Sequence, residues 1–187
     1  MLNDRSKIEK TLISIFNQKI TKREIIVIDG GSTDGTLEIL KKYKNNFKKL
    51  ISEKDEGLYY AMNKALQYAE GNALLFFNSG DLLINNVLND NFKVPSFLPY
   101  KYTNTFGSFT NGKIKNKKLT TPYCHQAIVF PNIKNIKYDT SFRFCADYKY
   151  ILEVFKKVNF PNKIQKVEGY VLYDNSGIST IHKKECL

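Results

Sequence analysis

The sequence predicts an α/β fold in which a Rossmann-like, mostly parallel sheet is flanked by helices. Apolar residues recur at helical spacing in separate segments, short β-branched runs lie between those segments, and glycines follow two of the runs. Parallel neighbours need crossover connections, so alternating helices and strands favour a sheet covered on both faces. In such sheets ligands bind beyond the carboxyl ends of the strands.

The first half of the chain carries the clearest pattern. A capping-box sequence over residues 6–9 predicts the start of a first helix, and apolar residues follow it at helical spacing. Residues 24–29 form a β-branched run entering Gly30, which is typical of a buried strand that ends in a turn. The alternation continues with helices over 37–47 and 58–69 and strands over 49–52 and 73–78.

Past residue 85 the pattern weakens. The sequence becomes rich in Asn, Lys and aromatic residues, and one helix stands out, starting at Asp147. The weaker strand-like stretches cover residues 103–110, 127–130 and 167–173. The chain is long enough for one domain with a sizeable core, so we expect a single domain over residues 1–187, with halves at 1–85 and 86–187.

The chain is strongly basic, with 29 Lys and Arg against 18 Asp and Glu and a formal charge of +11. An anionic partner fits this charge: nucleic acid, an anionic membrane leaflet or a phosphorylated small molecule; compositional bias is the alternative. No zinc-finger, RNP-like or helix-turn-helix signature accompanies the charge, so we expect no nucleic-acid partner. No apolar run approaches the ~20 residues that span a bilayer, and the N-terminus lacks a signal-peptide core. We therefore expect a cytoplasmic protein, with peripheral association at the inner face of the cell membrane.

Three motifs in order carry a family resemblance. Residues 24–36 read EIIVIDGGSTDGT, residues 52–63 read SEKDEGLYYAMN, and residues 76–81 read FFNSGD. Together they resemble family 2 glycosyltransferases with the GT-A fold, the nucleotide-diphospho-sugar transferase fold, especially bacterial enzymes that build surface polysaccharides. Later landmarks lie at residues 124–126, 146–148 and 177–179. The resemblance implies that residues 1–85 bind the nucleotide sugar and residues 86–187 face the acceptor.

The resemblance assigns five residues to the nucleotide-sugar donor: Asp29, Asp55, Asn63, Gly80 and His125. The first of them would approach the nucleobase and ribose, since a carboxylate accepts hydrogen bonds from a base N–H or a sugar hydroxyl. A cap on the turn or on the next helix is its alternative role. Many relatives carry a second Asp where this chain has Gly30, which leaves the identity of the base open.

Each of the other donor residues also has a structural alternative. Asp55 is implied as a second contact to the nucleotide, and its alternative is a helix cap or a solvated loop charge. Asn63 lies one turn into the same helix, where it could serve as a structural hydrogen-bonding group. His125 is implied to meet the pyrophosphate or the acceptor, whereas most lone histidines are structural or surface residues.

Residues 78–81 occupy the place of the family's metal motif. Asp81 matches the Asp that binds the metal, and Gly80 replaces the other frequent Asp. Mg²⁺ or Mn²⁺ bridging the donor phosphates would stabilise the charge of the departing nucleoside diphosphate. We expect the Asp81 side chain to contact this ion rather than to pack in the core; a plain strand-to-loop turn is the alternative.

Asp147 is the implied catalytic base. In the resembling enzymes a carboxylate at the start of a helix removes the proton of the acceptor hydroxyl as its oxygen attacks the anomeric carbon, and one displacement inverts the stereochemistry. An Asp at a helix start is also an ordinary N-cap, which is the alternative role.

The function implied is that of an inverting glycosyltransferase. It would move a sugar from a nucleoside diphosphate sugar, with UDP favoured by family habit, to a saccharide or lipid-linked saccharide during surface polysaccharide synthesis. One feature departs from the family: a strand reading like TPTYN usually precedes the first helix, and only a few residues precede Ser6 here. Its absence would leave unpaired backbone groups in the sheet and an incomplete donor pocket. A non-catalytic relative that binds nucleotide or saccharide is therefore the alternative.

Overall fold

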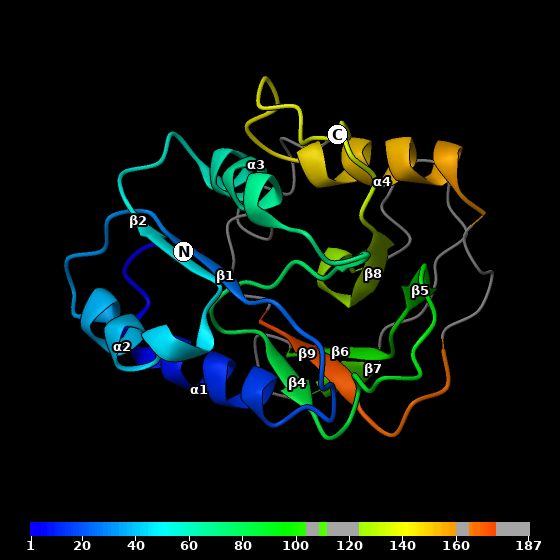
Figure 1. Ribbon diagram of the computed structural model, residues 1–187, viewed down its shortest axis with the longest axis horizontal. Helices are drawn as coiled ribbons and strands as arrows, with labels where there is room; N and C mark the ends of the chain where they lie inside the picture. Colours follow the sequence, from blue (N-terminus) through cyan, green and yellow to red (C-terminus); the bar gives the residue numbers. More distant parts are fainter. Residues whose placement is uncertain (104–108, 112–123, 160–164, 175–187) are drawn as a thin grey trace.

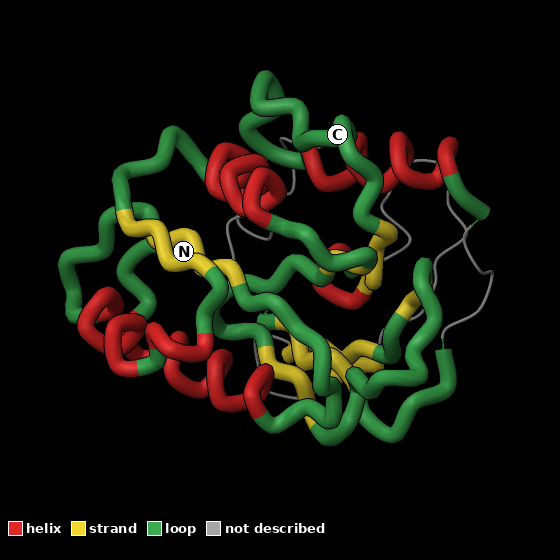
Figure 2. The backbone as a smooth tube through the Cα atoms, viewed as in Figure 1, coloured by secondary structure: helices red, strands yellow, loops and turns green. Residues whose placement is uncertain are grey.

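The computed structural model describes residues 1–103, 109–111, 124–159 and 165–174. Its helices are α1 (Arg5–Phe16), α2 (Thr36–Lys42), α3 (Leu58–Tyr68) and α4 (Ala146–Lys157), with short 3₁₀ turns at Lys44–Asn46 and His125–Ala127. Its strands are β1 (Ile26–Asp29), β2 (Lys49–Ser52), β3 (Ala73–Leu74), β4 (Leu82–Ile84), β5 (Ser96–Phe97), β6 (Tyr100–Thr103), β7 (Phe109–Asn111), β8 (Ile128–Pro131) and β9 (Tyr170–Tyr173). The strands are short and long loops join them (Figure 2).

The strands form three groups rather than one parallel sheet. β1 and β2 pair in parallel, β8 lies between β3 and β5 with antiparallel pairing to both, and the third group has the order β4-β9-β6-β7. Within that group β6 and β9 are parallel, whereas β9 is antiparallel to β4. The α/β fold is confirmed, but the expectation of mostly parallel pairing is wrong, because β8 and β9 from the second half run antiparallel to first-half strands.

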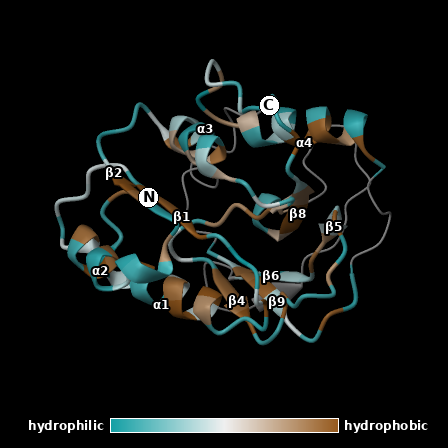
Figure 3. Cartoon of the chain, in the orientation of Figure 1, coloured by the Kyte–Doolittle hydropathy of each residue, from teal (hydrophilic) through white to brown (hydrophobic). Residues whose placement is uncertain are grey.

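Helices cover both sides of the β1–β2 pair. α1 and α2 lie on one side of it and α3 on the other, with α4 next to α3 (Figure 1). The hydropathy colouring shows β1 and β4 as hydrophobic, while many of the loops that connect the helices and strands are hydrophilic (Figure 3). No helix in the described ranges is long and apolar enough to cross a membrane.

Two predicted boundaries in the first half are wrong. The first helix starts at Arg5 with Asp4 as its N-cap, so Ser6 lies inside the helix, and no side-chain capping bond forms. The reason is tertiary: the Asp4 backbone N–H donates to Thr36 Oγ1 at 2.9 Å, which fixes where the helix begins. The strand predicted over 73–78 is limited to Ala73–Leu74, because β8 pairs with these two residues alone.

Met1 lies along the edge of β1 where the sequence predicted unpaired backbone groups. Its amino group donates to the Ile28 carbonyl at 3.1 Å, and the Gly30 N–H donates to the Met1 carbonyl at 2.7 Å. The Ile28 carbonyl and the Gly30 N–H are therefore paired, so the expectation of unpaired backbone groups is wrong for these two.

The core consists of three clusters. The cluster under α1 and α2 contains Ile8, Leu12, Val27 and Leu40. A second cluster, rich in aromatic rings, lies under α3 and α4 and includes Tyr59, Phe130, Tyr138 and Tyr150. A third, around β4, β8 and β9, includes Leu83, Val87, Val129 and Val171. The predicted apolar face of the first helix therefore points inward, as helical spacing requires. The predicted face of the third helix is only partly buried, since Met62 is 8% exposed but Leu58 is 42% exposed.

A matched pair of neighbouring residues on α1 tests this packing. Leu12 is 2% exposed and Ile13 is 44% exposed. Leu12→Ala should lower the free energy of unfolding by about 2–5 kcal/mol because it leaves a cavity. Ile13→Ala should change it by no more than about 0.5 kcal/mol. Urea denaturation followed by circular dichroism measures both, and equal losses would contradict the packing of α1 described above.

Candidate functional site

The turn between β3 and β4 is built around the buried carboxylate of Asp81. This residue is 1% exposed; its Oδ2 accepts the Asn78 N–H at 3.0 Å and its Oδ1 accepts the Asp174 N–H at 2.9 Å. Burial raises the pKa of the Asp81 carboxyl to about 7, and the nearby Asp174 charge adds to the rise, while the backbone hydrogen bonds oppose it. The expectation that this side chain stays out of the packing is therefore wrong. Asp81 ties the turn to the end of β9.

Asp174 lies opposite Gly80 and was not predicted from the sequence. β4 and β9 pair antiparallel with Leu82 facing Leu172, and the same register carried two residues further brings Asp174 to Gly80. A Cβ built on Gly80 would overlap the Asp174 carboxylate, and Gly80 has φ +102°. Lys7 from α1 forms an ion pair with Asp174 Oδ2 at 2.7 Å. No local sequence signal marks Asp174, because only strand pairing brings it to the turn.

The oxygen atoms at this turn suit a hard divalent cation such as Mg²⁺ or Mn²⁺. Two carboxylates, those of Asp81 and Asp174, come together, and the Ser79 hydroxyl oxygen is buried without a hydrogen-bond partner. Within the described ranges no three Asp, Glu, His or Cys side chains gather as a metal-binding group. Two carboxylates are too few to hold such an ion alone, so the phosphates of a ligand would have to supply most of its oxygen ligands.

Asp29 is the last residue of β1, and its side chain forms hydrogen bonds within the protein. It is fully buried, and its carboxylate accepts hydrogen bonds from the Ser32 N–H, the Ser32 hydroxyl and, at 2.6 Å, the Ser52 hydroxyl. Burial raises the pKa of the Asp29 carboxyl, but these hydrogen bonds outweigh it and leave the pKa below its ordinary value. The carboxylate fixes the turn after β1 to β2, and its contact with the nucleobase and ribose stays a prediction.

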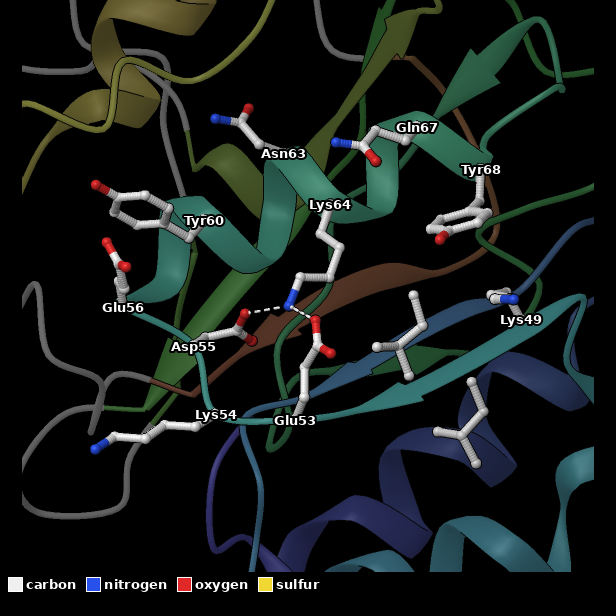
Figure 4. Close-up of a pocket in the computed structure, with 12 residues that line it drawn as sticks. Lys49, Glu53, Lys54, Asp55, Glu56, Tyr60, Asn63, Lys64, Gln67 and Tyr68 are labelled. Atoms are coloured by element: carbon white, nitrogen blue, oxygen red, sulfur yellow. Dashed lines mark hydrogen bonds and ion pairs between the residues drawn. The ribbon is translucent and has the colours of Figure 1, made fainter.

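Asp55 lines a cleft of about 680 Å³ between β2 and α3. Lys64 reaches from α3 to both Asp55 and Glu53, with 2.6 Å between Lys64 Nζ and Asp55 Oδ1 (Figure 4). The Asp55 side chain is 8% exposed, and its Oδ2 is buried and has no hydrogen-bond partner among the residues that the structure describes. A solvated loop charge is thereby excluded for Asp55. An orphan acceptor beside a cleft is a place where a ligand donor could bind.

Asn63 and His125 belong to the aromatic core rather than to an open pocket. The Asn63 amide bonds the Tyr138 backbone in both directions, donating to its carbonyl and accepting from its N–H, each at 2.8 Å. His125 is 5% exposed, its Nε2 lies 2.8 Å from the Tyr138 hydroxyl, and its ring stacks on Phe76. Burial lowers the pKa of His125 to about 4, although the Asp147 charge opposes this. Both residues have structural contacts, and their contacts with the nucleotide sugar stay predictions.

Asp147 lies in the first turn of α4, which begins at Ala146 rather than at Asp147. The N-cap is Cys145, with φ +64°, so Asp147 is not the capping residue. The Tyr59 hydroxyl donates to Asp147 Oδ1 at 3.3 Å. Burial raises the pKa of Tyr59, and so does the charge of Asp147, which keeps the phenol protonated. Tyr59 was missed as a neighbour of Asp147, although it lies inside the second motif.

The charges of the predicted site carboxylates shift the pKa values of two other groups, the Cys124 thiol and the Met1 amino group. Burial raises the pKa of the Cys124 thiol to about 12, and the charges of both Asp81 and Asp147 add to that rise. At the N-terminus burial lowers the pKa of the Met1 amino group, while the charges of Asp29, Asp4 and Asp55 oppose this. The charges of Asp81 and Asp147 thus both affect the Cys124 thiol, and those of Asp29 and Asp55 both affect the Met1 amino group.

The buried His125 predicts a pH-dependent stability. Its pKa is about 4 in the folded protein against 6.5 ordinarily, so between these values the unfolded chain binds more protons. Stability should rise with pH across that interval and be level above it. Relative to His125→Phe, the unfolding free energy should increase by about 3 kcal/mol from pH 4 to 7 in urea denaturation. A difference independent of pH would contradict a neutral buried imidazole.

Comparison with known proteins agrees with this architecture. Residues 1–92 match the family model described as Glycosyl transferase family 2. A cholesterol galactosyltransferase of Borreliella burgdorferi is 34% identical over 88 residues, which is 46% of this chain and 25% of that protein. The putative teichuronic acid biosynthesis glycosyltransferase TuaG of Bacillus subtilis is 37% identical over 82 residues, or 42% of this chain and 32% of the relative. The chain thus spans about a quarter to a third of these relatives' length.

Solved structures extend the likeness beyond residue 92. The crystal structure of S. aureus TarS matches with a TM-score of 0.72 and 22% identity over 93% of this chain and 35% of TarS. TarS 1–349 in complex with UDP matches with a TM-score of 0.69 and 22% identity, over 93% of this chain and 58% of that one. At this identity the likeness concerns the fold, which is GT-A. Residues 1–92 are therefore similar to glycosyl transferase family 2, and the chain shares the GT-A fold of TarS.

Proposed function

We propose that this protein is an inverting glycosyltransferase that moves a sugar from a nucleoside diphosphate sugar to a saccharide or lipid-linked saccharide in surface polysaccharide synthesis. The observation that carries the proposal is the match of residues 1–92 to glycosyl transferase family 2, together with the GT-A fold that the chain shares with TarS.

UDP is the proposed donor nucleotide. TarS, whose fold the chain shares, has been solved with UDP, and this supports the choice. TuaG is named for teichuronic acid biosynthesis, which supports a surface polysaccharide as the acceptor. The formal charge of +11 supports a peripheral association with an anionic membrane surface as well as a phosphorylated donor.

In the proposed reaction Asp147 acts as the general base. Its carboxylate accepts the proton of the acceptor hydroxyl while that oxygen attacks the anomeric carbon, and a single displacement inverts the configuration. Tyr59 donates a hydrogen bond to Oδ1 and helps to orient the carboxylate. When bound, a divalent cation supplies the positive charge that stabilises the departing nucleoside diphosphate, and Asp81 would hold it.

A nucleotide- or saccharide-binding protein without turnover is the second candidate. It is favoured by the commitment of Asp29 and Asp81 to backbone and side-chain hydrogen bonds within the protein. Isothermal titration with UDP, GDP, dTDP and CDP in the presence of Mn²⁺, followed by assays of hydrolysis of the matching sugar nucleotides, separates the candidates. Binding with donor consumption supports the transferase, binding alone supports the second candidate, and no binding rejects both.

The role of Asp147 can be separated from donor binding. Asp147→Asn should lower turnover by about 10²- to 10⁴-fold, the usual contribution of a positioned base, and should leave the affinity for UDP unchanged. Glu153→Gln, on the same helix, is the matched control and should retain turnover. Steady-state kinetics of donor consumption with a saccharide acceptor gives the comparison. A change of less than a few-fold in Asp147→Asn would mean that another residue is the base.

A further inference from the structure

The glycine of the 78–81 turn leaves room for a carboxylate that comes from elsewhere in the chain. The antiparallel register of β4 and β9 brings Asp174 opposite Gly80. A Cβ on Gly80 would overlap the Asp174 carboxylate and would lie 3.1 Å from the Asp174 Cβ. The Asp174 side chain therefore occupies the space that a side chain of residue 80 would need.

The Asp174 carboxylate is more accessible than that of Asp81. Its side chain is 23% exposed, whereas Asp81 is 1% exposed. A hydrogen bond links the two residues, since the backbone N–H of Asp174 donates to Asp81 Oδ1 at 2.9 Å. Asp174 already holds a cationic group, since Lys7 Nζ lies 2.7 Å from its Oδ2 and the Lys7 side chain is 42% exposed. An ion approaching the turn from solvent would meet Asp174 before Asp81.

A third oxygen lies at the same turn. The Ser79 hydroxyl oxygen is buried and has no hydrogen-bond partner. Buried polar atoms are nearly always paired, so an unpaired oxygen in the 78–81 turn is consistent with a position that a ligand completes.

We propose that Asp174 provides the second carboxylate of the donor site, in the space left by Gly80, and with Asp81 holds the divalent cation that accompanies the donor diphosphate. This inference rests on the proposed function, since the phosphates supply the remaining oxygen ligands. Lys7 and the divalent cation compete for the Asp174 carboxylate, because two positive charges repel when they share one anionic group. Lys7 therefore holds Asp174 in position until the cation binds.

The test measures free Mn²⁺ by electron paramagnetic resonance as the ion is titrated into protein with saturating UDP. Asp174→Asn keeps the backbone N–H that bonds Asp81 but loses the charge. It should weaken Mn²⁺ binding at least about tenfold, since even an outer-shell partner contributes about 10- to 100-fold. Lys7→Met removes the competing cation and should tighten Mn²⁺ binding by about two- to fivefold, the scale of an exposed ion pair. Thermal melts by circular dichroism establish that both variants fold.

The outcomes separate this inference from the proposed function. If Asp174→Asn binds Mn²⁺ as the wild type does, Asp174 is not a ligand, and the transferase proposal stands. If Lys7→Met instead loses UDP affinity whether or not Mn²⁺ is present, Lys7 contacts the diphosphate itself and the inference is overturned. Wild-type protein that binds neither UDP nor its Mn²⁺ complex overturns both proposals. Opposite shifts in the two variants, in a wild type that needs Mn²⁺ for tight UDP binding, support the inference.

Discussion

The buried Asp81 carboxylate connects the two halves of the chain. A carboxylate removed from water needs hydrogen bonds for each oxygen, and here one comes from Asn78 within the turn and the other from Asp174 at the end of β9. Thr11 on α1 adds a third tie, since its hydroxyl donates to the Asp81 carbonyl and accepts the Gly80 N–H. The turn is thereby fixed against α1 and β9 together. The pairing of β4 with β9 and the position of Asp174 beside Gly80 both depend on this arrangement.

The aromatic core beneath α3 and α4 also contains buried polar groups that hydrogen-bond to other parts of the protein. The Tyr138 ring stacks on Tyr150, its hydroxyl bonds His125, and its backbone bonds the Asn63 amide. The Tyr138 hydroxyl, the Tyr138 backbone and the Asn63 amide therefore have partners, which offsets the cost of burying them. Tyr59 packs on the Tyr138 ring and reaches Asp147 with its hydroxyl. The start of α4, and with it the proposed base, is held by the packing of these rings.

Much of the fold was predictable from local pattern. The strand over residues 49–52 has the predicted bounds, and the helix containing Leu12 buries the predicted face. The helix containing Met62 does so only in part, because Leu58 is exposed. The strand over 73–78 was overestimated, because an apolar run does not reveal how many of its residues find a partner strand. The antiparallel insertion of β8 and β9 was not predictable either, since strand direction depends on segments distant in sequence.

The sequence by itself determined the similarity to family 2 glycosyltransferases, the order of helices and strands in the first half, and the residue types around the site. Only the tertiary structure decided how those residues are used. Asp29 and Asp81 read as ligand-binding carboxylates, yet both are buried among internal hydrogen-bond donors. His125 lies in an aromatic core, and Asp174, with no motif around it, lies at the turn. The physical reason is that a motif specifies which groups a short segment carries. Whether each group meets solvent, a ligand or another part of the protein depends on burial and strand register, which distant residues set.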